Sequence, residues 1–346
     1  MAKEYQMGFG AILVNLPHSG AITQFVTDAL GNITGEEEGA LTVLFNAGIA
    51  NELFPLILFI GIGAMIDFGP ILTNPKLMIF GAAAQFGIFF TLCLASVFFD
   101  INDAASIGII GAADGPTSIL VSQIFNSKYV GAIAVAAYSY MALVPIIQPV
   151  AIKMVTTKKE RRIKMPYNPA AVSKKTRIFF PVIVTIIAGL VAPTSVSLVG
   201  FLMFGNLIRE CGVLKSLSET AQKELANLIT LLLGITISFS MKAEAFVSLE
   251  TLMIMGIGLI AFIFDTIAGC MFAKFMNLFS KTKINPMVGA AGISAFPMSA
   301  RVIQKMGLKE DPTNHLLMHA VGANVAGQIG SVVAGGMILS LVAQLL

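Results

Sequence analysis

Long stretches without charge alternate with short polar segments along most of the chain. Residues 77–99 and 130–152 contain no charged side chain. Each stretch is long enough to cross a hydrocarbon core of about 30 Å as an α-helix. The pattern therefore predicts membrane-spanning helices rather than the amphipathic or alternating elements of a water-soluble core.

Further apolar stretches are shorter or interrupted. They comprise residues 53–66, 104–125, 178–192, 196–208, 228–239, 251–272, 286–298 and 319–346. Glycines and prolines break 104–125 and 286–298, so we expect no straight helix in either. The pattern as a whole predicts an all-α polytopic membrane protein with about nine to eleven membrane segments, of which some are broken or re-entrant.

A basic segment, residues 153–177, separates two apolar halves. It contains nine Lys or Arg and a single acid, Glu160, while Pro166 and Pro169 prevent a continuous helix. By the positive-inside rule this loop is cytoplasmic. The other predicted divisions are an N-terminal interfacial or first-helix region at 1–52, a first repeat at 53–152, connecting helices at 178–225 and a second repeat at 226–346.

The N-terminal region, residues 1–52, is the least hydrophobic part of the chain. Its Gly-Glu-Glu-Glu-Gly run at 35–39 predicts a solvated turn between two weakly amphipathic stretches. The first residues lack a basic start followed by an apolar run and a small-residue cleavage site. We therefore expect the hydrophobic segments themselves to direct insertion.

Four short peptides of the first half recur in order in the second half. The pairs are residues 61–63 and 234–236, 77–81 and 252–256, 111–113 and 289–291, and 134–138 and 320–324. If an odd number of spans separates the two copies, the repeats are inverted, and their broken segments meet near the bilayer midplane. We therefore predict two inverted repeats and look for the functional site in the broken segments.

Composition excludes several classes of protein. Apolar residues make up 56% of the chain and charged residues 12%, with a mean hydropathy of +0.85. A soluble domain has about 25% charged residues, so a soluble enzyme is excluded. The formal net charge of +3 does not make a nucleic-acid-binding surface. No phosphate-cradling Gly-x-x-x-x-Gly-Lys-Ser/Thr motif occurs, which argues against an ATP-driven pump.

Cysteine and histidine give no sign of a transition-metal site. Cys93, Cys211 and Cys270 lie far apart in apolar surroundings, which indicates structural thiols. His315 and His319 stand four residues apart, yet no acidic or thiol ligand follows at a suitable spacing. We therefore expect no transition metal in this chain.

Asp114 is the leading candidate site residue. It lies in an apolar stretch, where a carboxylate costs about 2.5 to 3.5 kcal/mol and is kept facing a cavity, an ion or a partner charge. The neighbouring glycines and proline free backbone carbonyls, and Thr117 and Ser118 add hydroxyls. These hard oxygens suit an alkali cation such as Na⁺. The alternative is an Asp that only caps a helix.

The broken segment of the second half offers matching chemistry. Asn285 and Ser294 provide neutral oxygens, and Gly289 lies between them. Arg301, at the end of this segment, suits an anionic substrate group, although it could equally be an anchor at the membrane interface. Asn324 adds an amide in a third stretch rich in small residues.

Three further polar residues stand in apolar stretches. Tyr138 and Tyr140 could offer phenolic oxygens to a cation or relay a proton, or they could be interface anchors. Asp265 could join an ion path, or it could be a buried acid that is satisfied by a neighbouring helix.

Four motifs together resemble one protein family. Residues 108–117, 138–145, 285–301 and 322–328 are similar to the beta subunit of the biotin-dependent, sodium-pumping decarboxylases. That group includes oxaloacetate, methylmalonyl-CoA and glutaconyl-CoA decarboxylases. The resemblance runs from about residue 41 to the C-terminus.

The resemblance implies a function and a set of partners. A carboxyltransferase alpha subunit moves a carboxyl group onto biotin that is attached to a carrier subunit, not to this chain. The beta subunit then releases CO₂ from carboxybiotin, consumes a proton and exports Na⁺. A small membrane gamma or delta subunit, a homotrimer and the bacterial cytoplasmic (inner) membrane are also implied. The short N-terminal region favours an acyl-CoA decarboxylase complex.

The resemblance also implies roles for residues of this chain. Asp114, Tyr140 and Arg301 are then catalytic, and Na⁺ is bound by Asp114 together with Asn285, Gly289, Ser294 and Asn324. Asp114 would release Na⁺ when it receives a proton.

Two other interpretations remain open from the sequence. The first is a sodium-coupled secondary transporter of a small organic anion, which would share the broken, repeated segments. The second is a purely structural membrane anchor. This alternative is less favoured, because polar residues within the membrane are costly unless they have a function.

Overall fold

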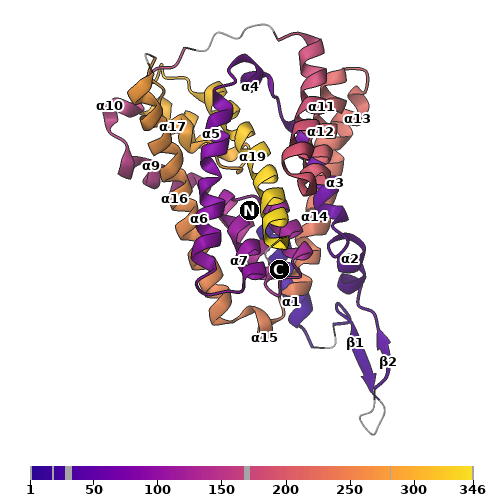
Figure 1. Ribbon diagram of the computed structural model, residues 1–346. Helices are drawn as coiled ribbons and strands as arrows, with labels where there is room; N and C mark the ends of the chain where they lie inside the picture. The colour runs from indigo at the N-terminus through magenta and orange to yellow at the C-terminus, as the bar shows by residue number, and fades with distance from the viewer. Residues whose placement is uncertain (1, 18, 28–32, 167–171, 281, 345–346) are drawn as a thin grey trace.

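The computed structural model describes residues 2–17, 19–27, 33–166, 172–280 and 282–344. Nearly all of its regular structure is helical, and one small β-hairpin projects beyond the helices at one end (Figure 1). The predicted all-α class is therefore confirmed. Helices satisfy their own backbone hydrogen bonds, as segments within a bilayer must.

The N-terminal region contains the hairpin. Its elements are α1 (Ala2–Asn15), β1 (Gln24–Thr27), β2 (Ile33–Glu37) and α2 (Ala40–Gly48). The two strands pair antiparallel, with Gln24 opposite Glu37. The predicted turn at 35–39 is wrong, because its first residues continue β2, although its glutamates are exposed as expected. Pairing with β1 decides this conformation, and the local pattern does not reveal such a partner.

The first apolar half is helical throughout. Its elements are α3 (Leu53–Met65), α4 (Gly69–Thr73), α5 (Leu77–Ala84), α6 (Phe86–Ala95), α7 (Ile101–Gly108), η1 (Ile109–Ala112), α8 (Gly115–Ile124) and α9 (Val130–Val155). A single residue, Gln85, separates α5 from α6, and together the two helices remain long and apolar enough to span a membrane. The break expected in residues 104–125 is confirmed between η1 and α8.

The basic segment is partly helical. Helix α9 extends into it, α10 (Lys158–Arg161) follows, and α11 (Lys174–Val191) begins before the segment ends. Thr157 and Glu160 form a capping box at the start of α10. Pro169 lies outside the described residues. The loop that joins these helices is therefore shorter than predicted.

The second half contains both short and long helices. Its elements are η2 (Pro193–Ser195), α12 (Val196–Cys211), α13 (Lys215–Thr220), η3 (Ala221–Leu225), α14 (Ala226–Thr236), η4 (Ile237–Ser240), α15 (Ala243–Phe246), α16 (Leu249–Phe279), α17 (Pro286–Ala290), α18 (Met298–Glu310) and α19 (Leu317–Ala343). The break expected in residues 286–298 is confirmed, because α17 has five residues and irregular chain joins it to α18.

Fewer helices have the length and composition of a membrane span than the number of segments that the sequence predicts. Within the described ranges, five helical segments are long and apolar enough to cross a membrane, or up to six if α2 and α3, which bend by 63°, form one span. The predicted nine to eleven segments are not confirmed. Helices such as α11, α12 and α17 are too short or too charged to count.

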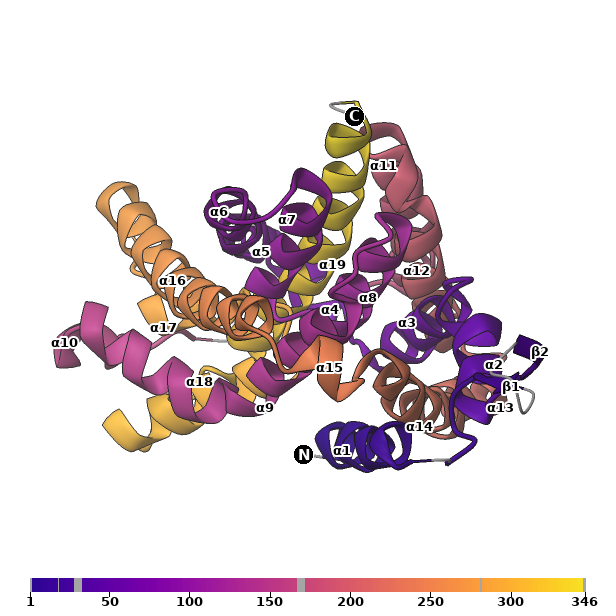
Figure 2. The ribbon, with the colours of Figure 1, turned by 90° about the horizontal axis from the view of Figure 1, so that it is seen from below.

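Small residues allow the long helices to pack closely. Gly81 of α5 lies against Ala326 of α19, and Gly258 of α16 lies against Tyr140 of α9. Figure 2 shows α19 between a group that contains α9, α16 and α18 and another that contains α3 and α12. This central helix is therefore placed to contact both groups.

The four echoed peptides fall on corresponding elements. They lie on α3 and α14, α5 and α16, η1 and α17, and α9 and α19. The α5–α6 run descends from α4 toward α7, whereas α16 rises from α15 toward α17 (Figure 1). Opposite directions are what inverted copies require. The boundaries of the two repeats stay a prediction.

Candidate functional site

Asp114 starts α8 at the break of the first half. Its Oδ1 accepts a hydrogen bond from the backbone N–H of Thr117 (3.3 Å), and Ala113 before it adopts a left-handed conformation (φ 53°) that ends η1. The Ser118 hydroxyl donates to the Asp114 carbonyl (2.7 Å). Asp114 is only 2% exposed. The capping role left open by the sequence is present, but it occupies one carboxylate oxygen only.

The other carboxylate oxygen of Asp114 faces α19. Its Oδ2 accepts from the hydroxyl of Ser331 (2.6 Å) and from Nε2 of Gln328 (3.2 Å). We did not predict either residue as part of the site. Asn324, Gln328 and Ser331 recur every three or four residues and therefore share one face of α19. A polar face on an apolar helix is the sequence signal that points to them.

The two broken segments meet beside this carboxylate. The Ser294 backbone N–H donates to the carbonyl of Ala112 (3.1 Å), just before Asp114 in the first half. The Ser294 hydroxyl donates to the carbonyl of Gly327 on α19 (3.0 Å). Asn324 also reaches this segment, since its Nδ2 donates to the carbonyl of Ile293 (2.6 Å). The structure thus brings Asp114, Ser294 and Asn324 together.

A cavity of about 370 Å³ lies at this meeting point. It is lined by Ile62, Met65, Ala113, Asp114, Gly115, Pro116, Met141, Ser294, Phe296, Pro297, Arg301 and Gln328. Asp114 forms a buried part of its wall, whereas Arg301 is solvent exposed. The cavity therefore runs between a buried carboxylate and an exposed guanidinium, which suits a small cation at one end and an anionic group at the other.

Two buried oxygens near Asp114 fit a sodium site. Oγ1 of Thr117 and Oδ1 of Asn324 have no hydrogen-bond partner among the described residues. A buried oxygen without a donor costs about 1–3 kcal/mol, which coordination to a cation would offset. Thr117 lies in the first turn of α8, and Asn324 lies one turn of α19 before Gln328. Hydroxyl, amide and carboxylate oxygens are the ligands that hard cations prefer.

The two tyrosines occupy different surroundings. The ring of Tyr138 lies against Gly115, directly after Asp114, where a Cβ on the glycine would clash with it. The Tyr140 hydroxyl instead donates to the carbonyl of Met255 on α16, and its ring stacks on Phe262 at 6.5 Å. Tyr138 therefore lies beside the carboxylate, and Tyr140 does not line the cavity.

Asn285 and Gly289 also lie apart from the cavity. Nδ2 of Asn285 donates to the carbonyls of Arg161 (2.8 Å) and Ile163 (2.9 Å) in the basic segment. Gly289 packs its backbone against Gly269 of α16, with no room for a side chain. The structure therefore does not bring these two predicted sodium ligands to Asp114.

The other predicted intramembrane acid, Asp265, belongs to a helix contact. It is fully buried on α16, and its Oδ1 accepts from the backbone N–H of Gly87 on α6 (3.2 Å). Asp265 does not line the Asp114 cavity. The interpretation as an acid held by a neighbouring helix fits this placement better than membership of the ion path.

Comparison with known proteins identifies the family. Residues 5–342 match the family model described as the Na⁺-transporting oxaloacetate decarboxylase beta subunit. The chain is 49% identical to the methylmalonyl-CoA decarboxylase subunit beta of Propionigenium modestum, over 99% of this chain and 91% of that protein. It is 48% identical to the oxaloacetate decarboxylase beta chain of Klebsiella pneumoniae, over 89% and 72% of the two chains.

A third relative has another substrate in its name. The chain is 46% identical to the glutaconyl-CoA decarboxylase subunit beta of Acidaminococcus fermentans, over 97% of this chain and 86% of that protein. The relatives thus share the decarboxylase beta-subunit description and differ in the acid that they name. The chain belongs to the family of Na⁺-transporting decarboxylase beta subunits.

Proposed function

We propose that this chain is the membrane subunit that releases CO₂ from carboxybiotin and couples this reaction to Na⁺ export. The observation that carries the proposal is the cavity between Asp114 and Arg301, where the broken segments of the two halves meet. Asp114 is the buried group that would bind the cation, and Arg301 is the exposed group that would bind the anionic substrate. Family membership favours this function over the organic-anion transporter.

Arg301 would orient the substrate. Its guanidinium can hold the carboxylate of carboxybiotin at the opening of the cavity by paired, charge-assisted hydrogen bonds. Cleavage of the bond between nitrogen and carboxyl carbon leaves that electron pair on the biotin ureido nitrogen and frees CO₂. The nitrogen then takes up one proton, so the step consumes a proton and regenerates biotin.

Asp114 would bind the transported ion. In its ionised form it holds Na⁺ together with Asn324 and Ser294, with the hydroxyl of Thr117 as a further ligand. When a proton reaches Asp114, the neutral carboxyl group loses most of its attraction for Na⁺, and the ion is released. Coupling therefore requires that proton and Na⁺ compete for one carboxylate.

The structure leaves fewer candidates for carrying the proton than the sequence does. The Tyr140 hydroxyl is engaged with the carbonyl of Met255, whereas the Tyr138 ring lies beside Asp114. We therefore assign the proton-carrying role to Asp114. Tyr138 lies next to it but receives no role in the transfer of the proton.

The partners follow from the reaction. A carboxyltransferase alpha subunit and a biotin carrier subunit must produce and deliver carboxybiotin, and a small gamma or delta subunit completes the membrane part. A homotrimer in the bacterial cytoplasmic membrane, with residues 153–177 in the cytoplasm, fits this arrangement. Oxaloacetate, methylmalonyl-CoA and glutaconyl-CoA all remain candidate carboxyl donors for the complex, because relatives that name each of these show nearly equal identity.

The first experiment measures CO₂ release from carboxybiotin by the purified protein in detergent, with and without Na⁺. The biotin carrier subunit is supplied, and wild type is compared with Asp114→Asn, which keeps the shape of the side chain but not its charge. We expect Na⁺-stimulated release that Asp114→Asn lowers at least about a hundredfold, since the charged ligand is lost. Full Na⁺-dependent activity in Asp114→Asn would contradict the mechanism.

A second result separates the alternatives. Uptake of a free carboxylate with Na⁺ into proteoliposomes, with no CO₂ released under any condition, would indicate the secondary transporter instead. Wild-type turnover that tolerates substitution of Asp114, Asn324 and Arg301 alike would indicate a structural anchor.

A further inference from the structure

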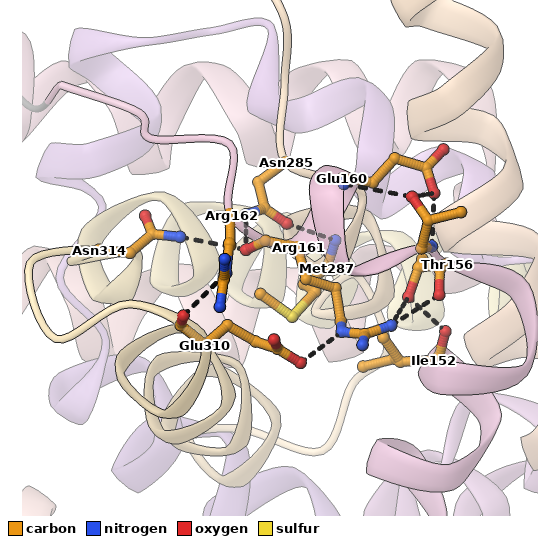
Figure 3. Close-up of polar contacts among 10 residues, drawn as sticks. Ile152, Thr156, Glu160, Arg161, Arg162, Asn285, Met287, Glu310 and Asn314 are labelled. Carbon is orange, nitrogen blue, oxygen red and sulfur yellow. Dashed lines mark hydrogen bonds and ion pairs between the residues drawn. The ribbon is translucent and has the colours of Figure 1, made fainter.

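One backbone carbonyl in the basic segment accepts two side-chain amides. The carbonyl of Arg161, at the end of α10, accepts from Nδ2 of Asn285 (2.8 Å) and from Nδ2 of Asn314 (3.1 Å) (Figure 3). Asn285 is the N-cap of α17, and Asn314 follows α18. The two donors therefore lie on either side of the stretch that runs from α17 through α18.

The Arg161 side chain joins the same two regions. It is only 6% exposed, its Nε pairs with Oε1 of Glu310 (2.7 Å) at the end of α18, and one terminal nitrogen donates to the carbonyl of Thr156 (2.6 Å). The neighbouring Arg162 donates from Nε to the Glu310 carbonyl (3.0 Å). The hydrogen bond from Arg161 lowers the pKa of Glu310. A buried guanidinium is tolerated only with such pairing.

These contacts enclose the part of the chain that carries Ser294 and Arg301. The segment starts at Asn285, passes through α17, Ser294 and Arg301, and ends at Glu310. Both of its ends are fastened to Arg161. The clamp therefore fixes both ends of the stretch from which Ser294 and Arg301 line the cavity.

The hydrogen bonds of Asn285 turn its side chain away from a sodium ion at Asp114. Its Nδ2 donates to two carbonyls, and its Oδ1 accepts from the backbone N–H of Met287 (3.1 Å) as the cap of α17. This oxygen keeps a second lone pair, so its position is what excludes it as a sodium ligand: the oxygen faces the first turn of α17 and not Asp114. Asn285 also lies outside the cavity.

We propose that Asn285, Asn314, Arg161 and Glu310 form a clamp that positions the segment of Ser294 and Arg301. On this view Asn285 serves the sodium-dependent reaction through the clamp, as a positioning residue, and not as a sodium ligand. The expected effect on activity rests on the proposed function, whereas the expected effect on trypsin cleavage rests on the geometry of the clamp alone.

The test compares Asn314→Ala with Asn285→Asp. Asn285→Asp keeps the oxygen that caps α17, and its carboxylate would bind a cation more strongly than the amide does. The substitution also replaces the donating amide group with an acceptor that faces the Arg161 carbonyl. Lys159→Ala is the matched control, since it removes an exposed charge from α10 that makes none of the clamp contacts. We measure kcat, the Na⁺ concentration for half-maximal rate, and trypsin cleavage after Arg161 and Arg162.

The clamp predicts the same behaviour in both asparagine variants. Each should lower kcat about tenfold or more and speed cleavage after Arg161 by a similar factor, since each variant loses a buried hydrogen bond to the Arg161 carbonyl. Their changes in half-maximal Na⁺ should be equal. The double variant Asn285→Ala/Asn314→Ala should be little worse than either single alanine variant, because the two amides share one acceptor. Lys159→Ala should resemble wild type.

A sodium-ligand role for Asn285 predicts the opposite result. Asn285→Asp would then keep activity with an unchanged or lower Na⁺ requirement and normal trypsin resistance, and Asn314→Ala would resemble wild type. That outcome would overturn the clamp. If wild type itself released no CO₂, the proposed function would fail, while the cleavage assay would still decide whether the clamp exists.

Discussion

At the scale of single residues, the chemistry of the site depends on how Asp114 is surrounded. One of its oxygens caps α8, and the other accepts from two side chains of α19. These donors fix the direction of the carboxylate and hold it in place for an ion. Because Ser331 makes the shortest of these bonds, it should matter for the site although it does not line the cavity.

Ser331→Ala tests this role. Loss of a hydrogen bond to a charged group costs about 1.5–3 kcal/mol, so we expect the Na⁺ concentration for half-maximal decarboxylation to change by about tenfold or more. Ser340→Ala is the matched control on the same helix, since its hydroxyl contacts Thr194 at the surface (2.9 Å). Na⁺ titrations of both variants provide the measurement. If both variants had the same Na⁺ concentration for half-maximal decarboxylation as wild type, Ser331 would have no part in the site.

The sequence predicted some of these residues and missed others for a physical reason. Asp114 stands out because a carboxylate in an apolar stretch is costly wherever its helix packs. Gln328 and Ser331 are ordinary polar residues on a helix, and only the packing of α19 against α8 gives them their role. Asn285 illustrates the reverse case, since its polar side chain in a broken segment meets the basic segment and not the ion site.

At the scale of elements, local sequence signals predicted the breaks well. Glycine and proline placed the interruptions before α8 and around α17, because these residues act on their own backbone. The hairpin of β1 and β2 was missed, since strand pairing depends on a partner elsewhere in the chain. Contact between the broken segments also depends on tertiary packing, in which α19 passes so close to Gly292 that Gly327 has no space for a side chain.

Gly327→Ala should disrupt this contact. A Cβ at Gly327 would overlap the carbonyl oxygen of Gly292, so α19 must move away from the segment that carries Ser294. We expect a loss of about 1–3 kcal/mol in stability and a large loss of Na⁺-dependent activity. Gly256→Ala on α16 is the control, because its Cβ would meet open space and alanine favours helix. Thermal unfolding in detergent and activity assays of both variants decide the question; equal behaviour would contradict the packing argument.

At the scale of the whole molecule, the arrangement places different features at opposite ends of the long helices. Helix α10 lies at one end, and the hairpin of β1 and β2 projects from the other (Figure 1). The clamp lies with α10, because Arg161 of that helix is its centre. The chain reverses direction between α5–α6 and α16, so the two broken segments enter from opposite sides and meet in the interior. Substrate binding at one end and ion release at the other are then possible without a continuous channel.

This arrangement makes a prediction about orientation. If the basic segment is cytoplasmic, Lys159 on α10 faces the cytoplasm and Glu37 on β2 faces the outside. In a Cys93→Ser background, which removes an exposed native thiol, a membrane-impermeant maleimide should label Glu37→Cys in intact cells. Lys159→Cys should react only in inside-out vesicles. Labelling of Lys159→Cys from outside would show that the orientation is the opposite one. Carboxybiotin made in the cytoplasm could then not reach the end of the molecule where the clamp holds the segment of Arg301.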